Sequence, residues 1–237
     1  LQPRVAVLHD RRGLAYAALE QYHEAVMSYD RALEIDHRPE VFAHKGVCLA
    51  ELGMYRDAIE SFEKAIEIDE ELPEAWLGKG NAYYDLGKYS EARVAYDRGL
   101  ALNPENAEGW TRYGMILSSL GQFDAAIESY DRAMQIDPAF SIAYFTKGSA
   151  LFALGRHQEA VDSFNAMIDL QPEFVDAWIH KGRVLQEMHQ YQDALTSFKR
   201  ALEIDPARRE IWTDIGDILD EIGRHEEAKI CYEKAKM

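Results

Sequence analysis

The sequence has little cysteine and a shortage of positive charge. Cys48 and Cys231 are the only cysteines among 237 residues, and no CxxC spacing occurs. This excludes a disulfide framework and a cysteine zinc site, and favours a reducing, cytoplasmic compartment. Basic residues number 26 and acidic residues 42, so the net charge is −16. Because nucleic acids attract basic proteins, this balance argues against nucleic-acid binding and favours basic partners.

Long apolar runs and catalytic motifs are also missing. No run approaches the roughly 18 residues that would suggest a membrane span. The phosphate loop GxxxxGK[ST], the GxSxG elbow and the HExxH metal motif do not occur. His23, His157, His189 and His225 fall at or near expected turns, where we expect them to be solvated. We therefore expect no catalytic residue, no metal and no cofactor.

What the sequence does contain is a repeat of about 34 residues. Seven times, a glycine is followed twelve residues later by an alanine, and that alanine four residues later by an aromatic residue. The glycines are Gly13, Gly46, Gly80, Gly114, Gly148, Gly182 and Gly216. The matching aromatics are Tyr29, Phe62, Tyr96, Tyr130, Phe164, Phe198 and Tyr232. A fixed period of this size predicts a stacked solenoid.

Each repeat predicts a pair of antiparallel helices. In residues 73–106, one helical pattern ends at Gly87, which suits a left-handed C-terminal cap. A second pattern ends before Pro104, because proline disfavours helix at the residue that precedes it. We expect Gly80 and Ala92 to let the two helices approach closely, and Trp76 and Tyr96 to fill the space between pairs.

These residues resemble the tetratricopeptide repeat signature, W-x2-L-G-x2-Y followed by Ala, Phe and Pro. Trp76, Gly80, Tyr83, Ala92, Tyr96 and Pro104 match it in the third repeat. The resemblance implies an all-α, right-handed α-solenoid superhelix that forms one continuous domain. One departure recurs, because lysine replaces the signature leucine at Lys45, Lys79, Lys147 and Lys181. We expect these lysines to lay their stems on apolar surface and to keep the ammonium in water.

The repeat boundaries follow from this register. Residues 1–5 are expected to be the tail of a preceding repeat, and the last repeat to be truncated and uncapped. The seven repeats are residues 6–38, 39–72, 73–106, 107–140, 141–174, 175–208 and 209–237. Because end repeats normally need a polar cap, the expected bare ends suggest possible self-association.

The family resemblance implies a concave groove lined by the first helix of each repeat. The groove candidates for peptide binding are Leu77, Asn81, Tyr84, Arg112, Met115, Phe145, Ser149, Phe152, Ile179 and Arg183. The expected acidic rim consists of Glu40, Glu51, Glu74, Asp85, Glu108, Asp176 and Glu187. An apolar track between acidic rims predicts a partner that combines apolar and basic residues.

The sequence thus predicts a non-catalytic scaffold that binds a protein or peptide. Acidic chaperone tails are not the expected partner, because no lysine stands at the fifth position of any repeat to form the family's carboxylate clamp. Three alternatives stay open. The groove residues could serve superhelical packing alone, the chain could assemble with copies of itself, or it could recruit substrates for a larger enzyme, as in protein O-linked sugar transferases.

Overall fold

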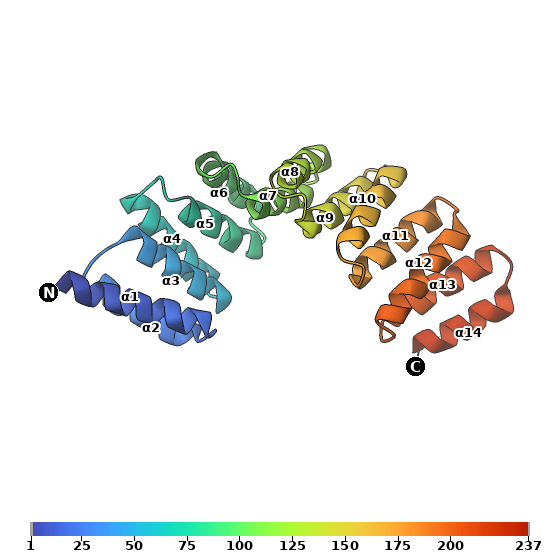
Figure 1. Ribbon diagram of the computed structural model, residues 1–237, viewed down its shortest axis with the longest axis horizontal. Coiled ribbons are helices and arrows are strands. Elements are labelled where there is room, and N and C mark those ends of the chain that lie inside the picture. Colours follow the sequence, from blue (N-terminus) through green and yellow to red (C-terminus); the bar gives the residue numbers. More distant parts are fainter. Residues whose placement is uncertain (1, 237) are drawn as a thin grey trace. The chain divides into compact units, whose positions relative to one another are not determined.

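The protein is all-α, as the repeat pattern predicts. A computed structural model describes residues 2–236, and every regular element within them is a helix (Figure 1). The helices of this range are α1 (Gln2–Ala18), α2 (Tyr22–Leu33), α3 (Pro39–Glu51), α4 (Tyr55–Ile68), α5 (Pro73–Asp85), α6 (Tyr89–Leu102), α7 (Ala107–Ser119), α8 (Phe123–Ile136), α9 (Ser141–Ala153), α10 (His157–Leu170), α11 (Val175–Glu187), α12 (Tyr191–Ile204), α13 (Glu210–Glu221) and α14 (His225–Lys236).

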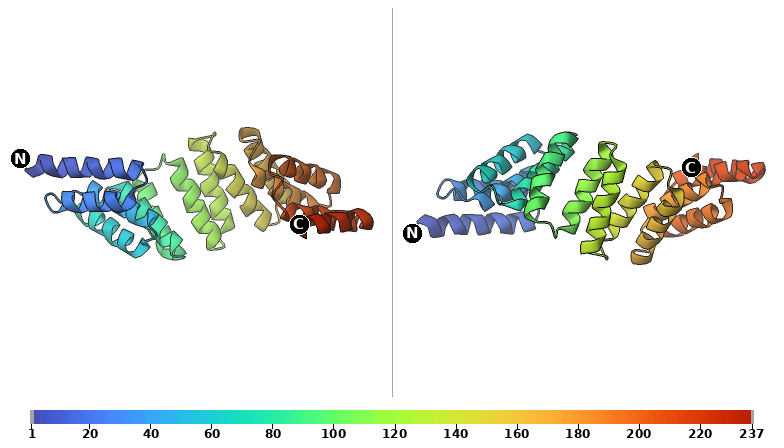
Figure 2. Two further views of the ribbon diagram at one scale, coloured as in Figure 1. Left: turned by 90° about the horizontal axis from the view of Figure 1, so that it is seen from below. Right: turned by 90° about the horizontal axis from the view of Figure 1, so that it is seen from above.

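The helices form two compact units, one ending at Gly121 and the other beginning at Gln122. In the first unit, α1 and α2, α3 and α4, and α5 and α6 pack as pairs, and α7 packs on α6. In the second unit, α8 packs on α9, and the pairs are α9 and α10, α11 and α12, and α13 and α14. Within each unit, the second helix of a pair packs against the first helix of the next (Figure 2). The single continuous solenoid stays a prediction.

The glycine of each pair lies against the aromatic ring of the same pair. A Cβ atom added to Gly80 would lie 2.4 Å from Cδ2 of Tyr96, and one added to Gly182 would lie 2.6 Å from Cε1 of Phe198. The backbones also come close at this point, as expected, because the Cβ added to Gly80 would lie 3.4 Å from the Ala92 carbonyl oxygen. Tyr96 is 1% exposed and Phe198 is fully buried, so the contact forms the centre of each pair.

The turn between the two helices of a repeat contains a residue with a left-handed backbone conformation. Gly53, Gly87, Gly121, Gly155 and Gly223 have φ angles between +72° and +78°. Two repeats reach the same region without glycine, at Glu20 with φ +58° and at His189 with φ +57°. The predicted C-terminal caps are therefore confirmed, and the non-glycine turns carry the cost of a side chain in this conformation.

The recurring lysines lie in a different environment from the one we expected. Their ammonium groups do not simply face water, because three of them bind a carboxylate on the preceding second helix. Lys45 Nζ lies 2.6 Å from Asp30, Lys79 Nζ 2.9 Å from Glu63, and Lys147 Nζ 2.6 Å from Asp131. Position 165, which corresponds to Asp131, is asparagine, and Lys181 instead lies over the Trp178 ring at 5.3 Å. These three ion pairs tie α3, α5 and α9 to the second helix that precedes each of them.

The tryptophans anchor the links between repeats. Trp76 Nε1 donates a hydrogen bond of 2.9 Å to the Glu70 carbonyl, and Trp110 Nε1 one of 2.8 Å to the Pro104 carbonyl. Trp178 makes the same contact with Pro172 at 2.9 Å. These indoles are half-buried. These three tryptophans therefore have a structural role, as expected, but they contact the link between repeats and not the buried core.

The structure does not separate the first residues of the chain from the first repeat. Residues 2–5 are helical and continuous with the rest of α1, whereas residues 1 and 237 lie outside the described residues. The assignment of residues 1–5 to the tail of a preceding repeat stays a prediction.

The buried alanine of each pair gives a direct test of this packing. We expect Ala92→Leu to lower the free energy of unfolding by about 1–3 kcal/mol, because Ala92 is 0% exposed and added methylenes overpack a filled site. Ala101→Leu on the exposed side of the same helix is the matched control, and it should change stability little. Thermal and urea unfolding followed by circular dichroism would measure both, and equal stability of the two variants would contradict the account.

Candidate functional site

The structure brings four of the sequence-predicted groove residues together in the first unit. Asn81 and Tyr84 from α5, and Arg112 and Met115 from α7, line one small hollow of about 10 Å³ together with Ile116. They belong to equivalent faces of two neighbouring first helices, which the stacking of repeats places side by side. Tyr84 and Met115 supply partly exposed apolar surface between the polar groups of Asn81 and Arg112.

The polar groups of this pocket are partly engaged within the protein. Asn81 Oδ1 accepts a hydrogen bond from the Tyr96 hydroxyl, which leaves its amide nitrogen as the donor group of the side chain. Arg112 Nε donates to Glu108 at 3.0 Å, and half of the Arg112 side chain is exposed. Such an exposed ion pair is weak, since the median contribution of surface pairs is about 0–1 kcal/mol. A peptide could therefore compete for either partner.

The fifth position of the repeats contributes to packing, and Leu77 and Phe145 keep intermediate exposure there, as Tyr84 and Met115 do at the twelfth and ninth positions. Ile179 is 3% exposed, so it offers almost no surface to a ligand. Leu77 is half-buried and lies against Gly99, where an added Cβ would come within 2.7 Å of Leu77 Cδ2. Phe145 is half-buried and has ring contacts with Phe164 at 5.8 Å and with Phe174 at 5.3 Å. The structure thus removes Ile179 from the groove surface, whereas Leu77 and Phe145 keep part of theirs.

The remaining candidates of the second unit lie on α9 and α11 and are engaged with their own neighbours. Ser149 Oγ donates to the Phe145 carbonyl at 3.1 Å. Phe152 meets the edge of the His157 ring at 5.6 Å. Arg183 forms an ion pair with Asp214 of α13 at 3.0 Å. Phe152 and Arg183 keep partial exposure.

The acidic rim residues stand at both ends of the first helices. Glu40, Glu74 and Glu108 lie in the first turns of α3, α5 and α7, and all three are exposed. Glu51 and Asp85 are the last residues of α3 and α5. A carboxylate at a helix C-terminus opposes the helix dipole, at a cost of about 0.3–1 kcal/mol. Helix stability therefore does not account for Glu51 and Asp85.

The second unit carries the other two predicted rim residues. Asp176 forms an ion pair with Arg208, and Glu187 is the exposed last residue of α11. Asp176 is thus partly neutralised by its own unit, whereas Glu187 repeats the unfavourable C-terminal placement of Glu51 and Asp85. Most of the predicted rim residues, Glu40, Glu51, Glu74, Asp85 and Glu108, belong to the first unit.

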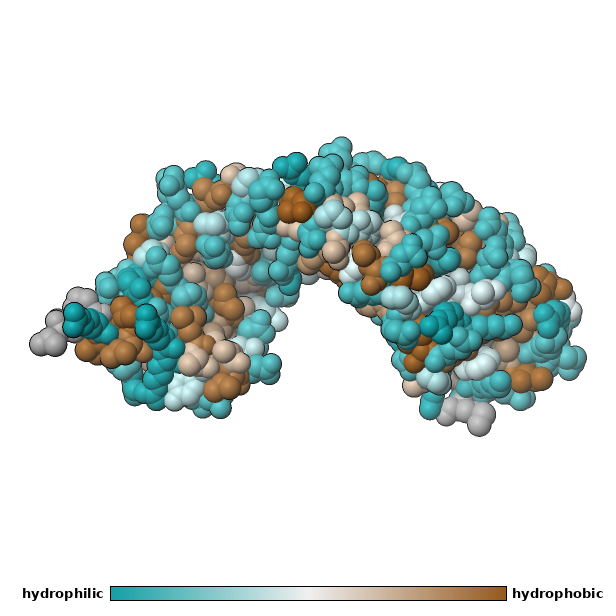
Figure 3. All heavy atoms as spheres, viewed as in Figure 1, coloured by the Kyte–Doolittle hydropathy of each residue, from teal (hydrophilic) through white to brown (hydrophobic). Residues whose placement is uncertain are grey.

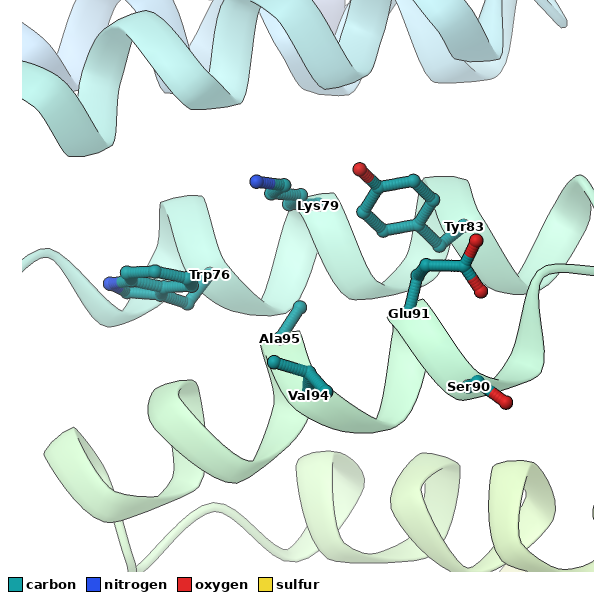
Figure 4. Close-up of a pocket in the computed structure, with 7 residues that line it drawn as sticks. All are labelled: Trp76, Lys79, Tyr83, Ser90, Glu91, Val94 and Ala95. Atoms are coloured by element: carbon teal, nitrogen blue, oxygen red, sulfur yellow. The ribbon is translucent and has the colours of Figure 1, made fainter.

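A second hollow, which the sequence interpretation missed, lies on another face of the third repeat. It has a volume of about 350 Å³, and its walls are Trp76, Lys79 and Tyr83 from α5 and Ser90, Glu91, Val94 and Ala95 from α6 (Figure 4). Its counterpart of about 290 Å³ in the fifth repeat includes Tyr144, Lys147 and Asp162 at equivalent positions. In the sequence, the hollow is marked by Val94, an apolar residue at the position where the fifth repeat has Asp162. The Val94 side chain is 61% exposed.

The cysteines and histidines behave as structural groups. Burial raises the pKa of the Cys48 thiol to about 11, with a smaller contribution from Glu51. A thiol held neutral in this way is a poor nucleophile. His23, His189 and His225 are exposed, as expected for turn residues, whereas His157 is half-buried. No group of His, Cys, Asp and Glu among the described residues could hold a metal ion.

Comparisons with known proteins complete the identification. Models of the tetratricopeptide repeat match residues 7–37, 77–139, 120–173 and 173–236, and a model described as TPR repeat matches residues 48–86. The chain belongs to the tetratricopeptide repeat family. A search of curated proteins finds no match. Tetratricopeptide repeat proteins are generally non-catalytic interaction scaffolds, and membership of this family supports a role in protein–protein interaction.

Solved tetratricopeptide structures resemble the chain over most of its length. MamA is 27% identical, with 66% of this chain and 91% of that chain covered and a TM-score of 0.63. YrrB, described as a TPR protein with an unusual peptide-binding site, is 24% identical, with 77% and 95% covered and a TM-score of 0.66. PilF of Pseudomonas aeruginosa is 15% identical, with 93% and 99% covered and a TM-score of 0.77. The last two likenesses concern the fold alone.

Hydropathy adds one observation on the tetratricopeptide helices. Among the described residues, no helix is both long enough and apolar enough to cross a membrane.

The burial of His180 predicts that the stability of the second unit depends on pH. Its ring contacts Phe145 at 5.1 Å and Phe164 at 5.8 Å, and burial lowers its pKa, with a smaller contribution from Arg183. A histidine whose folded pKa is lowered binds fewer protons than in the unfolded chain, so stability is lost as the pH falls through about 6.5. We expect the melting temperature to fall between pH 7.5 and pH 5.5, and to fall less in His180→Leu.

The control is His23→Leu, which replaces an exposed histidine of the first unit. It should retain the full pH dependence of the unchanged protein in the same thermal melts. An identical loss of stability in His180→Leu and in the unchanged protein would show that the burial of His180 is not its cause.

Proposed function

We propose that the chain is a non-catalytic scaffold that binds an extended peptide along α3, α5 and α7 of the first unit. The observation that carries the proposal is the cluster of Asn81, Tyr84, Arg112 and Met115 around one pocket. Apolar surface flanked by a few polar groups is the usual composition of a recognition site. The described peptide-binding site of YrrB is consistent with this use of the fold.

The partner is proposed to combine apolar and basic side chains. Tyr84 and Met115 offer a flat aromatic surface and a flexible thioether, which suit an aliphatic or aromatic side chain. Glu51 and Asp85 stand at the same ends of adjacent first helices without stabilising them. Because these two carboxylates do not stabilise their helices, we attribute them to the binding of a cation from outside the chain. A lysine or arginine side chain of the peptide supplies that cation.

The amide and guanidinium of the pocket would hold the peptide backbone. The Asn81 amide nitrogen can donate to a peptide carbonyl, as can the Arg112 guanidinium, whose partner Glu108 lies at the exposed start of the same helix. Neither group needs a particular peptide side chain, so they set the position of the peptide. Specificity then comes from the exposed apolar surface of Tyr84 and Met115 and from the carboxylates.

A peptide array tests this proposal. The probes are 12-residue peptides of matched length that vary in their numbers of Lys, Glu and Leu, and the best binders are titrated by fluorescence anisotropy. We expect peptides that combine Lys and Leu to bind best, and Tyr84→Ala/Met115→Ala to weaken them at least about tenfold, because it removes the central apolar contacts. Glu51→Lys/Asp85→Lys should weaken the basic peptides and reduce the salt dependence of their binding.

The matched control is Ile68→Ala/Val94→Ala, which also removes two exposed apolar side chains of the same unit but from second helices. It should leave peptide affinity unchanged. Loss of binding in this control, with normal binding by the Tyr84→Ala/Met115→Ala variant, would contradict the groove and indicate the hollow beside Val94 instead. Circular dichroism confirms that each variant is folded.

A further inference from the structure

The hollow between α5 and α6 has a more apolar wall than its equivalents in four other repeats. This α5–α6 hollow is lined by Trp76, Lys79, Tyr83, Ser90, Glu91, Val94 and Ala95 (Figure 4). Val94 and Ala95 occupy positions 22 and 23 of the repeat. The second, fourth, fifth and sixth repeats have polar residues at both positions, namely Glu60 and Ser61, Glu128 and Ser129, Asp162 and Ser163, and Thr196 and Ser197. The third repeat therefore lacks both polar groups of this wall.

Packing within the helix pair does not account for Val94. Its side chain is 61% exposed, whereas that of the adjacent Ala95 is 2% exposed. Hydrophobic residues are interspersed with hydrophilic ones on the face of the first unit that Figure 3 presents, so one exposed valine is ordinary by itself. Val94, however, borders a hollow of about 350 Å³ that also includes Trp76, whose indole is held by its hydrogen bond to the Glu70 carbonyl. The hollow is therefore a pre-formed apolar surface within the size range of ligand pockets.

Glu91 lies at the edge of this hollow without a partner for its charge. The equivalent glutamates of the fifth and seventh repeats are each bound by an arginine at 2.6 Å, in the pairs Arg156–Glu159 and Arg224–Glu227. The third repeat has Lys88 at the position of these arginines, and its ammonium lies over the Tyr83 ring at 5.8 Å. Glu91 has no ion pair among residues 2–236. Its carboxylate is therefore available to a cation from outside the chain.

We propose that the α5–α6 hollow binds an aromatic side chain of a partner protein, and that Glu91 binds a neighbouring lysine or arginine of the same segment. The ring packs on Val94 and against the Trp76 indole, because offset and edge-to-face ring pairs are favourable beyond the area that they bury. The Lys79 ammonium is neutralised by Glu63 at 2.9 Å, so Glu91 is the uncompensated charge of the lining. A positive charge on the partner complements it.

The geometry of α6 gives the spacing of the two partner residues. Val94 and Glu91 are three residues apart on this helix, which places their Cβ atoms about 5–6 Å apart. In an extended segment, residues i and i+2 face the same side and are about 6.6 Å apart. Figure 4 shows Glu91 on the Tyr83 side of Val94, so the basic residue lies toward the turn that joins α5 and α6. The partner segment therefore contains an aromatic residue, any residue and a basic residue, in an order that the direction of binding decides.

A second copy of this chain fits the hollow poorly. Every Phe, Trp and Tyr within residues 2–236 is buried or half-buried, so a copy presents no exposed aromatic side chain. The net charge of −16 makes two copies repel each other, whereas it attracts a basic segment. The hollow is also distinct from the proposed peptide groove, because Glu91 and Val94 belong to a second helix. Its occupant is therefore an aromatic and basic segment of a different protein.

The probe for the test is the synthetic peptide Gly-Ser-Trp-Gly-Arg-Ser-Gly, and the readout is the Trp76 indole N–H signal of the nitrogen-labelled complete chain. We expect the peptide to shift this signal, and Val94→Asp to weaken binding at least about tenfold, because a carboxylate would be desolvated against the ring. The matched control is Met27→Asp, because Met27 is 58% exposed at the same position of the first repeat. It should bind normally, as should the groove variant Tyr84→Ala/Met115→Ala.

A charge exchange tests the role of Glu91. Glu91→Lys should weaken the probe, and it should bind a peptide with glutamate in place of the arginine better than the unchanged chain does. A peptide with alanine in place of the tryptophan should bind the unchanged chain at least about tenfold more weakly.

Failure of the probe to shift the Trp76 signal, or equal binding by the Val94→Asp and Met27→Asp chains, would overturn the proposal. So would a concentration-dependent dimer in sedimentation velocity that Val94→Asp abolishes, since the occupant would then be a second copy. Circular dichroism verifies that each variant is folded.

Discussion

The contact between a glycine and an aromatic ring within each helix pair is the constraint on which the other features depend. The ring of Phe62 lies where a side chain at Gly46 would have to go, and the ring of Phe164 has the same relation to Gly148. A side chain at these glycines would push the two helices of a pair apart. Because the contact recurs at Gly13, Gly46, Gly80, Gly148, Gly182 and Gly216, it gives these six helix pairs the same internal geometry. Equivalent positions of neighbouring first helices therefore line up within a unit.

That alignment decides which residues are available for binding. Stacking buries the third and tenth positions of the first helices and much of the fifth, as Ala75, Ala82 and Ile179 show. The ninth and twelfth positions keep surface, and in the first unit Asn81, Tyr84 and Met115 occupy them. Function in this fold is therefore limited to residues that the packing does not use. The groove of the first unit is one such surface.

Much of the fold follows from the sequence, because the repeat period fixes the register of every helix pair. The end of α5 before Gly87 and the end of α6 before Pro104 were both predictable from cap and stop residues. The lysine ion pairs were not, since their prediction requires the rotation of one helix relative to the next. Lys79 meets Glu63 across two repeats, and nothing in the local sequence joins them.

The candidate site was predictable in part. Asn81, Tyr84, Arg112 and Met115 meet as the repeat register predicts. At the fifth position, Ile179 is 3% exposed, whereas Phe145 is half-buried like Tyr84 and Met115. Their burial depends on the side chains opposite, and Met167, which is 1% exposed where other repeats have alanine or glycine, fills the core beside Phe145. Periodicity specifies the face on which a residue lies, whereas exposure depends on the volume of its neighbours.

Chemical-shift mapping on the isotope-labelled chain tests the central claim, that the first helices of the first unit form the peptide groove. A peptide that combines lysine and leucine would be added stepwise while backbone amide and methyl signals are recorded. The account predicts that the largest shifts fall on Asn81, Tyr84, Arg112 and the Met115 methyl group. Shifts concentrated on Trp76, Tyr83 and Val94, with the Met115 methyl unmoved, would contradict it.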